Sequence, residues 1–322
     1  MNWLDHTHPA EAAPGDVDLE DRTCLVPCFT EPEPLAKSIK MVGVLNPPML
    51  RQRRDGTFVP VLGRRRLKVA RDLGMPTVQI RIIGDSASEA ELFSLAVWDN
   101  LGHRPFDQAC TAFVIRRLLE LLPREVVATR FLPVLGVPAH GPRLERMRIL
   151  GGLEENILEA LAQGKILEKT ALVLARMDHP QRLLLFGLTR GLVLNTNKSA
   201  EVIEHLFDLS MVQGRTVSDI LATVEMRSIL DDPRARRHEK GQRLRELLLT
   251  WKFPELLEKQ ARFDRTIGKL ADPPKITVRH SPGFEDERCS VMFNGNSWDE
   301  AAEAIARLKE MEPRESSTGN GD

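Results

Sequence analysis

The chain has 322 residues, of which 42% are hydrophobic and 28% are charged. This composition is typical of a folded protein and too apolar for wholesale disorder, and the length allows two or three domains of roughly 100–150 residues each. No apolar run approaches the ~18 residues of a membrane span, and the acidic N-terminus lacks the basic and apolar blocks of a signal peptide. Four cysteines are too few for a disulfide scaffold, so we expect a cytoplasmic protein with no membrane contact.

Charge is distributed very unevenly along the chain, although the formal net charge is −1. Residues 1–33 carry eight acids against one base, whereas residues 51–81 carry nine bases against two acids. The near-neutral total therefore does not exclude an anionic ligand. It predicts a basic surface confined to the N-terminal part of the chain.

The first quarter of the chain is expected to hold a flexible acidic lead followed by a small mixed sheet with two helices. The lead, residues 1–23, shows no periodicity. In the sheet domain, residues 24–85, Gly43 is expected to cap the first helix and Pro60 to keep its strand near an edge. The expected elements are a short strand at 25–27, a helix at 33–41, strands at 48–52 and 57–62, a helix at 64–73 and a strand at 77–83.

Helical spacing dominates from residue 86 onward, which gives the chain an α+β fold class in which sheet and helices are segregated. We expect Trp298 to lie in the core of a small α/β module near the C-terminus. The predicted parts are a helical domain at 86–178, a helical extension at 179–230, a charged linker at 231–241, the α/β module at 242–312 and a disordered tail at 313–322.

The junction of strand and helix at Gly63 is the first segment that could carry chemistry. A strand that turns directly into a helix aims several backbone N–H groups and the positive end of the helix dipole at one place. Arg64, Arg65 and Arg66 follow at once, and guanidinium groups match phosphate oxygens in a bidentate way. Because successive helical positions lie ~100° apart, at most two of the three can face a common ligand. The alternative interpretation is a solvated basic face.

Two further segments carry polar groups suited to a ligand. One is a glycine-containing loop expected between two helices, which holds Asp99, Asn100, His103 and Arg104. These side chains suit a metal ion or a nucleotide, and they equally suit helix capping. The other is Asn46, which precedes two prolines and suits either a base or sugar contact or an ordinary turn.

The order of these segments resembles the N-terminal domain of the ParB partition-protein family. That family's pattern runs roughly L-x-x-S-I-x-x-x-G-x-x-Q-P, a hairpin, G-E-R-R-x-R-A and then an E-N-x-x-R block. The resemblance spans about residues 24–178. The matching positions are Ser38, Ile39, Gly43, Asn46 in place of glutamine, Pro47, Gly63, Arg65, Arg66, Ala70, Asp99 in place of glutamate, and Asn100, with His103 by spacing or Arg104 by chemistry as the basic residue.

The resemblance implies a domain that binds CTP, or another nucleoside triphosphate, together with a magnesium ion. It also implies that binding closes the protein into a clamp on DNA. Carried over by position, the resemblance assigns nucleoside contacts to Gly43 and Asn46 and phosphate contacts to Gly63, Arg65 and Arg66. It assigns the metal–triphosphate contacts to Asp99, Asn100 and either His103 or Arg104.

One departure from the family pattern concerns hydrolysis. The acid that follows the family's glycine is Arg64 in this chain, and an arginine adds positive charge where metal and water chemistry is helped by an acid. Glu31 or Glu33 could supply the acid from the preceding loop. The pattern therefore favours nucleotide binding over hydrolysis and leaves a weak CTPase activity open.

The family places a helix-turn-helix unit next, which corresponds to residues 124–150. We expect a first helix at 124–131, Gly136 in the turn and a recognition helix at 139–150. The basic residues that could reach base edges and phosphates in a major groove are His140, Arg143, Arg146 and Arg148. Three prolines interrupt this unit and its turn exceeds the usual ~3–4 residues, so the alternative is a helical platform with solvated basic side chains.

We therefore predict a ParB-like, nucleoid-associated DNA-binding protein with a nucleoside-triphosphate switch. It would act in chromosome or plasmid partition or in transcription regulation. Two alternatives stay open: an enzyme on the same fold, such as a small-molecule kinase or a nuclease, and a regulatory adaptor that has lost nucleotide use. Homodimer formation and a partner protein on the C-terminal module are left open as well.

Overall fold

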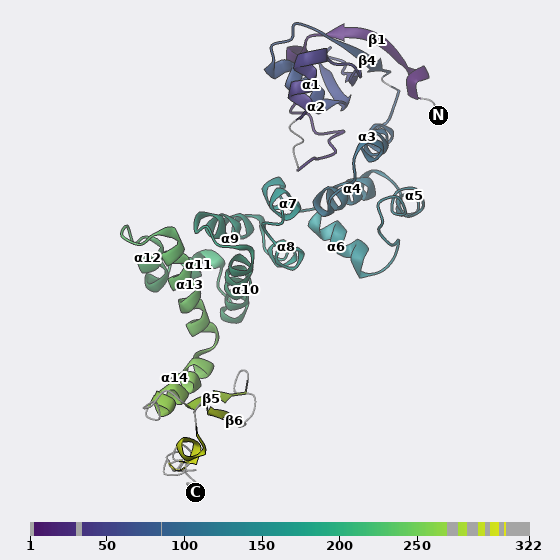
Figure 1. The fold of residues 1–322 in the computed structure, drawn as a ribbon. Helices are drawn as coiled ribbons and strands as arrows, with labels where there is room; N and C mark the ends of the chain where they lie inside the picture. The colour runs from purple at the N-terminus through teal and green to yellow at the C-terminus, as the bar shows by residue number, and fades with distance from the viewer. Residues whose placement is uncertain are drawn as a thin grey trace. The chain divides into compact units, whose positions relative to one another are not determined.

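The computed structural model describes residues 3–29, 34–84, 86–268, 276–281, 289–293, 297–302 and 306 (Figure 1). The chain divides into two compact units, Met1–Gly241 and Gln242–Asp322. A four-stranded mixed sheet lies at the N-terminal end of the first unit, and a long series of helices follows it. The α+β fold class expected from the sequence is therefore confirmed.

The N-terminal sheet has the strand order β1–β4–β2–β3. Its strands are β1 (Thr7–Ala12), β2 (Met49–Gln52), β3 (Phe58–Leu62) and β4 (Val78–Ile83). β2 runs parallel to β4, whereas β1 pairs antiparallel with β4 and β3 pairs antiparallel with β2. Pro60 therefore lies on an edge strand, as predicted, where its missing N–H interrupts no ladder on the open side.

The alternation of side chains along the strands gives the sheet two buried faces. On one face, Leu50 and Ile80 pack with Leu67 and Ala70 of α2 (Arg64–Asp72), which lies beside α1 (Pro34–Val42) (Figure 1). On the other face, Met49, Val61 and Ile83 pack with Leu92 and Ala96 of α3 (Glu89–His103). Helices thus cover both faces, with α2 on one face and α3 on the other.

The expectation of a flexible acidic lead is wrong for the described residues between 3 and 23. They contain η1 (Trp3–His6), β1 and η2 (Pro14–Asp16), and Ala12, Val17 and Leu19 are buried. Two of the acids that suggested disorder, Asp18 and Asp21, pair with Arg53 of the basic hairpin. Arg53 donates to Asp18 at 3.1 Å and to Asp21 at 2.5 Å. Residues 25–27, by contrast, form no strand.

The helices after the sheet follow the expected pattern, with local signals at their ends. Ser88 and Glu91 form a capping box at the start of α3, and Asp107 caps α4 by accepting from the Cys110 N–H. The helices from α4 to α12 are α4 (Gln108–Leu121), α5 (Arg124–Arg130), α6 (Pro142–Leu150), α7 (Glu155–Ala162), α8 (Glu168–Ala175), α9 (His179–Gly191), α10 (Thr196–Gln213), α11 (Val217–Leu221) and α12 (Val224–Leu230).

The helix that leads into the second unit was not placed fully from the sequence. Helix α13 (Arg237–Lys252) begins inside the segment 231–241 that was expected to be a linker, because Glu239 accepts from the backbone N–H of Arg236 and starts the helix. Further along are α14 (Pro254–Gly268) and the antiparallel strands β5 (Ile276–His280) and β6 (Cys289–Phe293). Trp298 is 90% exposed, so its expected core position is wrong.

Within the described residues, no helix is both long and apolar enough to cross a bilayer.

Candidate functional site

The turn from β3 into α2 requires glycine for two reasons. Gly63 has φ +80°, a left-handed conformation that side chains disfavour. A Cβ atom at this position would also lie 3.0–3.1 Å from the guanidinium group of Arg66. No side chain caps the first turn of α2, so its backbone N–H groups and the positive end of the helix dipole are available to an anion.

The three arginines that follow Gly63 point to different partners. Arg64 donates to the carbonyl oxygens of Leu19 and Asp21, so it ties the N-terminal segment to α2 and its donors are engaged with the backbone. That at most two of the three arginines face a common ligand stays a prediction. Burial lowers the pKa of Arg64, and the negative charge of Asp21 works against that shift.

Arg66 brings together residues from all three segments that the sequence singled out. Its guanidinium group lies over Gly63 and donates to the carbonyl oxygen of Asn46, whose side chain is exposed. Burial lowers the pKa of Arg66, and the charge of Asp99 on α3 raises it. His103 Nε2 lies 3.5 Å from Asp99 Oδ1. Asn46 and Gly63 thus contact Arg66, and Asp99, with His103 beside it, acts on Arg66 through its charge. We call these five residues the Arg66 cluster.

The segment 99–103 is helical, and the expectation of a loop there is wrong. Helix α3 continues through Gly102 and ends at His103, with Arg104 as its C-cap directly before a proline. The helical geometry lets Asn100 Nδ2 donate to the Ala96 carbonyl at 2.8 Å. The Asn100 side-chain oxygen is not used by that bond and is left as a potential metal ligand.

The structure gives different surroundings to the two basic residues that the sequence left open. His103 lies beside Asp99, whereas Arg104 points away, donates to the Pro27 carbonyl at 2.7 Å and stacks over Phe106. Both terminal nitrogens of Arg104 lie 3.8 Å from Cys110 Sγ. The residues matched to the E-N-x-x-R block are therefore split between two surroundings.

Arg65 lies near residues that the sequence pattern did not assign to the site. Its Nη1 is 3.9 Å from Cys28 Sγ, and Cys28 is half-buried. No spacing in the sequence indicated this contact, because it joins α2 to a stretch without regular structure. Glu31 and Glu33, which could have supplied an acid, lie outside the described residues.

Gly43 ends α1 as expected. Its φ is +74° and its N–H donates to the Ile39 carbonyl at 2.9 Å.

The residues proposed to hold magnesium offer part of the oxygen ligands that this ion needs. Asp99 offers a carboxylate and Asn100 an amide oxygen, and magnesium typically takes one or two protein oxygens while water and phosphate supply the others. Among the described residues there is no group of three or more His, Cys, Asp or Glu side chains that could hold a metal alone.

The predicted helix-turn-helix is represented by α5 and α6, but residues 131–141 separate them. This linking segment is longer than the turn expected between helices at 124–131 and 139–150, and α6 packs against α4 and α8. His140, Arg143 and Arg146 line one hollow of about 660 Å³, whereas Arg148 lines a different one. The four basic residues therefore do not share one surface, because the helical turn places Arg148 on the opposite side of α6.

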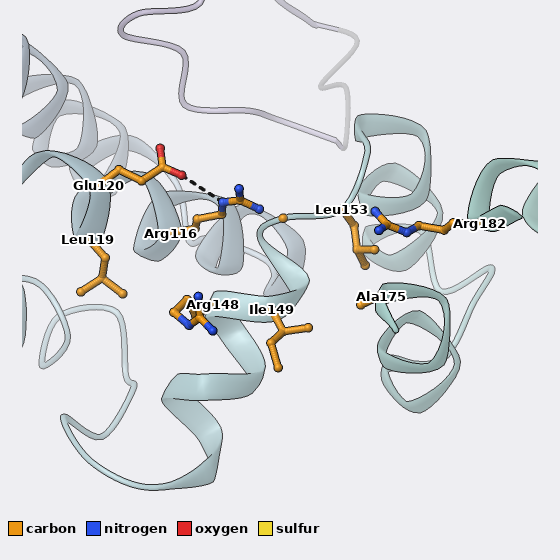
Figure 2. A pocket seen from close by; sticks show the side chains of 9 residues that line it. Arg116, Leu119, Glu120, Arg148, Ile149, Leu153, Ala175 and Arg182 are labelled. Carbon is orange, nitrogen blue, oxygen red and sulfur yellow. Dashed lines mark hydrogen bonds and ion pairs between the residues drawn. The ribbon is translucent and has the colours of Figure 1, made fainter. Parts of the chain in front are cut away.

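The hollow that contains Arg148 has a volume of about 450 Å³ (Figure 2). Each of its arginines is matched by a carboxylate. Arg116 Nε donates to Glu120 at 3.0 Å, Arg148 makes two bonds to Glu145 at 3.0 and 2.6 Å, and Arg182 donates to Glu154 at 2.9 Å. The positive charge of this pocket is therefore compensated within the protein.

Fold and cluster together define a small α+β domain with an arginine-rich helix start, followed by a helical domain. Residues 31–101 match the family model described as the ParB N-terminal domain. Residues 31–101 are therefore similar to a ParB N-terminal domain, as the resemblance predicted, and this stretch includes the whole Arg66 cluster except His103.

Three solved structures are similar to the chain at low identity. The C-terminally truncated chromosome-partitioning protein ParB from Caulobacter crescentus in complex with CTP-gamma-S is 20% identical, with 55% of this chain and 96% of that one covered and a TM-score of 0.25. The same protein complexed to the centromeric parS site is 17% identical, with 61% and 98% covered and a TM-score of 0.31. A Pnob8-like ParB-N domain is 15% identical, with 79% and 97% covered and a TM-score of 0.37.

At TM-scores below 0.5 these likenesses add nothing to the family-model match. No curated protein matches the chain.

Proposed function

We propose that the chain is a DNA-binding protein whose ParB N-terminal domain binds a nucleoside triphosphate, CTP above the others, as a switch. The observation that carries this proposal is the start of α2. Arg65 and Arg66 lie there beside uncapped N–H groups, Asp99 of α3 lies close to Arg66, and all of these residues fall in the matched domain. This arrangement suits a polyphosphate that carries a cation.

The proposed phosphate contacts follow from the side chains around Gly63. The first-turn N–H groups of α2 take one phosphate, and Arg65 and Arg66 take the others. Arg66 is partly buried, and a guanidinium group with little water around it forms stronger bonds to an anion than an exposed one. The nucleoside would lie toward Gly43 and Asn46, because Arg66 already holds the Asn46 carbonyl.

Magnesium would be held by Asp99 and Asn100 together with the phosphates, and when bound it supplies positive charge to the triphosphate. His103 would orient the Asp99 carboxylate, since the two side chains are 3.5 Å apart. Arg64 is engaged with backbone carbonyls and supplies no acid or base. The proposal is therefore one of binding, and hydrolysis is no part of it.

DNA is the proposed second ligand, and the proposed contacts are His140, Arg143 and Arg146. These side chains are exposed and lie around one hollow of α6. Basic side chains bind DNA mainly through its phosphates, so DNA affinity should fall steeply as the salt concentration rises. Such a protein would serve chromosome or plasmid partition, or transcription regulation.

Calorimetry with each of the four nucleoside triphosphates and magnesium, with and without DNA, tests the nucleotide site. Arg65→Ala should weaken CTP binding at least about tenfold, which corresponds to the ~1.4 kcal/mol or more expected for a lost charge-assisted contact. Arg71→Ala is the matched control, because Arg71 is an exposed arginine in the last turn of the same helix. Equal weak binding of all four nucleotides, unchanged by Arg65→Ala, would contradict the proposal.

A further inference from the structure

The hollow beside α6 has features that DNA phosphates do not need. It lies between the linking segment 131–141, α6 and the start of α4, and its volume is about 660 Å³. Sites for small molecules typically enclose about 300–1,000 Å³. We call it the α6 hollow.

Its apolar wall comes from the linking segment and from α6. Leu135, Val137, Pro138 and Met147 contribute to that wall, and Val137 and Met147 are only 4% exposed. The linking segment is held in place by backbone bonds: the Leu135 N–H donates to Phe131 at 3.0 Å and the Val137 N–H to Leu132 at 3.0 Å. The wall is therefore already formed in the absence of a ligand.

The rim of the hollow carries more positive than negative charge. Arg143 and Arg146, with the imidazole of His140 nearby, face one acid, Glu168. Glu168 already accepts from Gln108 Nε2 at 2.6 Å, and Arg146 reaches it only at 3.9 Å. Among the residues that the structure describes, no carboxylate lies within ion-pairing distance of Arg143.

The pocket in Figure 2 provides the contrast, because each arginine there already has a carboxylate partner. An added anion would have to displace those carboxylates. In the α6 hollow, Arg143 can accept an anion without breaking a bond to any described carboxylate. The uncompensated charge is therefore specific to the hollow that also has an apolar wall.

We infer that the α6 hollow binds a small organic anion with an apolar body, such as a carboxylate that carries an aromatic or branched group. The carboxylate lies between Arg143 and Arg146, which offer bidentate donors. The apolar body lies against Leu135, Val137 and Met147, where it leaves water. An occupant would neutralise two of the proposed DNA contacts and so lower DNA affinity. That consequence rests on the proposed function, whereas the site itself does not.

Calorimetry on the full chain, without DNA or nucleotide, tests the site with three compounds. They are 3-phenylpropionate, acetate, which keeps the charge and lacks the body, and phenethylamine, which keeps the body and reverses the charge. We expect saturable binding of 3-phenylpropionate and binding at least about tenfold weaker for the other two. Equal binding of acetate would indicate an adventitious ion only, and equal binding of phenethylamine would indicate an apolar surface without selectivity. Either result would overturn the inference.

Two variants connect the binding to the hollow. Arg143→Ala removes an exposed side chain and should weaken 3-phenylpropionate binding about fivefold or more through loss of a charge-assisted contact. Arg130→Ala is the control, because Arg130 is an exposed arginine at the end of α5 that does not line the hollow. Equal effects of the two substitutions, or no effect of Arg143→Ala, would reject the site.

Discussion

At the scale of single residues, the candidate site depends on a glycine that carries two separate constraints. Gly63 has a left-handed backbone and lies under the Arg66 guanidinium group. Gly74 shares the first constraint only: its φ is +67°, and an added Cβ atom there would meet nothing within 4 Å. Comparing a substitution at Gly63 with one at Gly74 therefore distinguishes the effect of backbone strain from the effect of displacing Arg66.

Gly63→Ala should lower the free energy of unfolding by about 1–2 kcal/mol and also weaken CTP binding. The first effect comes from the left-handed backbone, and the second comes from displacement of Arg66. Gly74→Ala should show the first effect alone. Urea unfolding and calorimetry measure the two quantities, and a similar loss of CTP affinity in both variants would disprove the role assigned to Gly63.

The residue types at this candidate site could be recognised in the sequence, but not which of the side chains lie together. The glycine and the arginines were recognisable because helix starts and phosphate chemistry use those residue types. Which arginine turns away could not be deduced, since Arg64 finds its partners in carbonyls more than 40 positions earlier in the chain. The separation of His103 from Arg104 likewise depends on where α3 ends.

At the scale of elements, the strands and helices with strong periodicity were predicted to within a few residues, and β1 was missed. Its sequence is short and contains a proline and an acid, so neither composition nor alternation distinguished it from a tail. β1 forms because it pairs with the edge of β4. That partner lies far along the chain, so the local sequence of β1 does not predict the pairing. The α6 hollow was missed for the same reason, although a longer turn around Gly136 was expected between the two helices.

The ion pairs of Arg53 are expected to hold this N-terminal segment against the sheet domain. Arg53→Ala would leave Asp21, whose side chain is only 8% exposed, without its cation. Asp21 would keep the hydrogen bonds from Thr23, but a largely buried carboxylate that loses its charged donor costs about 1–3 kcal/mol. Hydrogen exchange of residues 7–23, followed by mass spectrometry, should therefore become faster.

Arg54→Ala is the matched control for that experiment, because Arg54 is the neighbouring, exposed residue of the same hairpin. It should leave exchange in residues 7–23 unchanged. Unchanged exchange in Arg53→Ala would show that strand pairing alone retains the segment.

At the scale of the whole molecule, the first unit contains buried thiols whose ionisation opposes folding. Burial raises the pKa of Cys24 from 9.0 to about 12, with a smaller contribution from Asp21, and burial likewise raises the pKa of Cys110 to about 12. In the unfolded chain these thiols lose their protons near their ordinary pKa, whereas in the folded protein they keep them up to about pH 12. Their contribution to stability is therefore complete below pH 9 and is lost as the pH rises above it.

Calorimetric unfolding in the presence of reductant should show this loss between pH 8 and pH 10. Each thiol can contribute a slope of up to about 1.4 kcal/mol per pH unit above pH 9. The chain has no tyrosine, so phenol ionisation does not obscure the effect. The double variant Cys24→Ala/Cys110→Ala should be less stable at pH 8 because two packed side chains are truncated, yet its stability should fall less between pH 8 and pH 10. Parallel pH profiles for the two proteins would show that these thiols ionise as readily in the folded state as in the unfolded one.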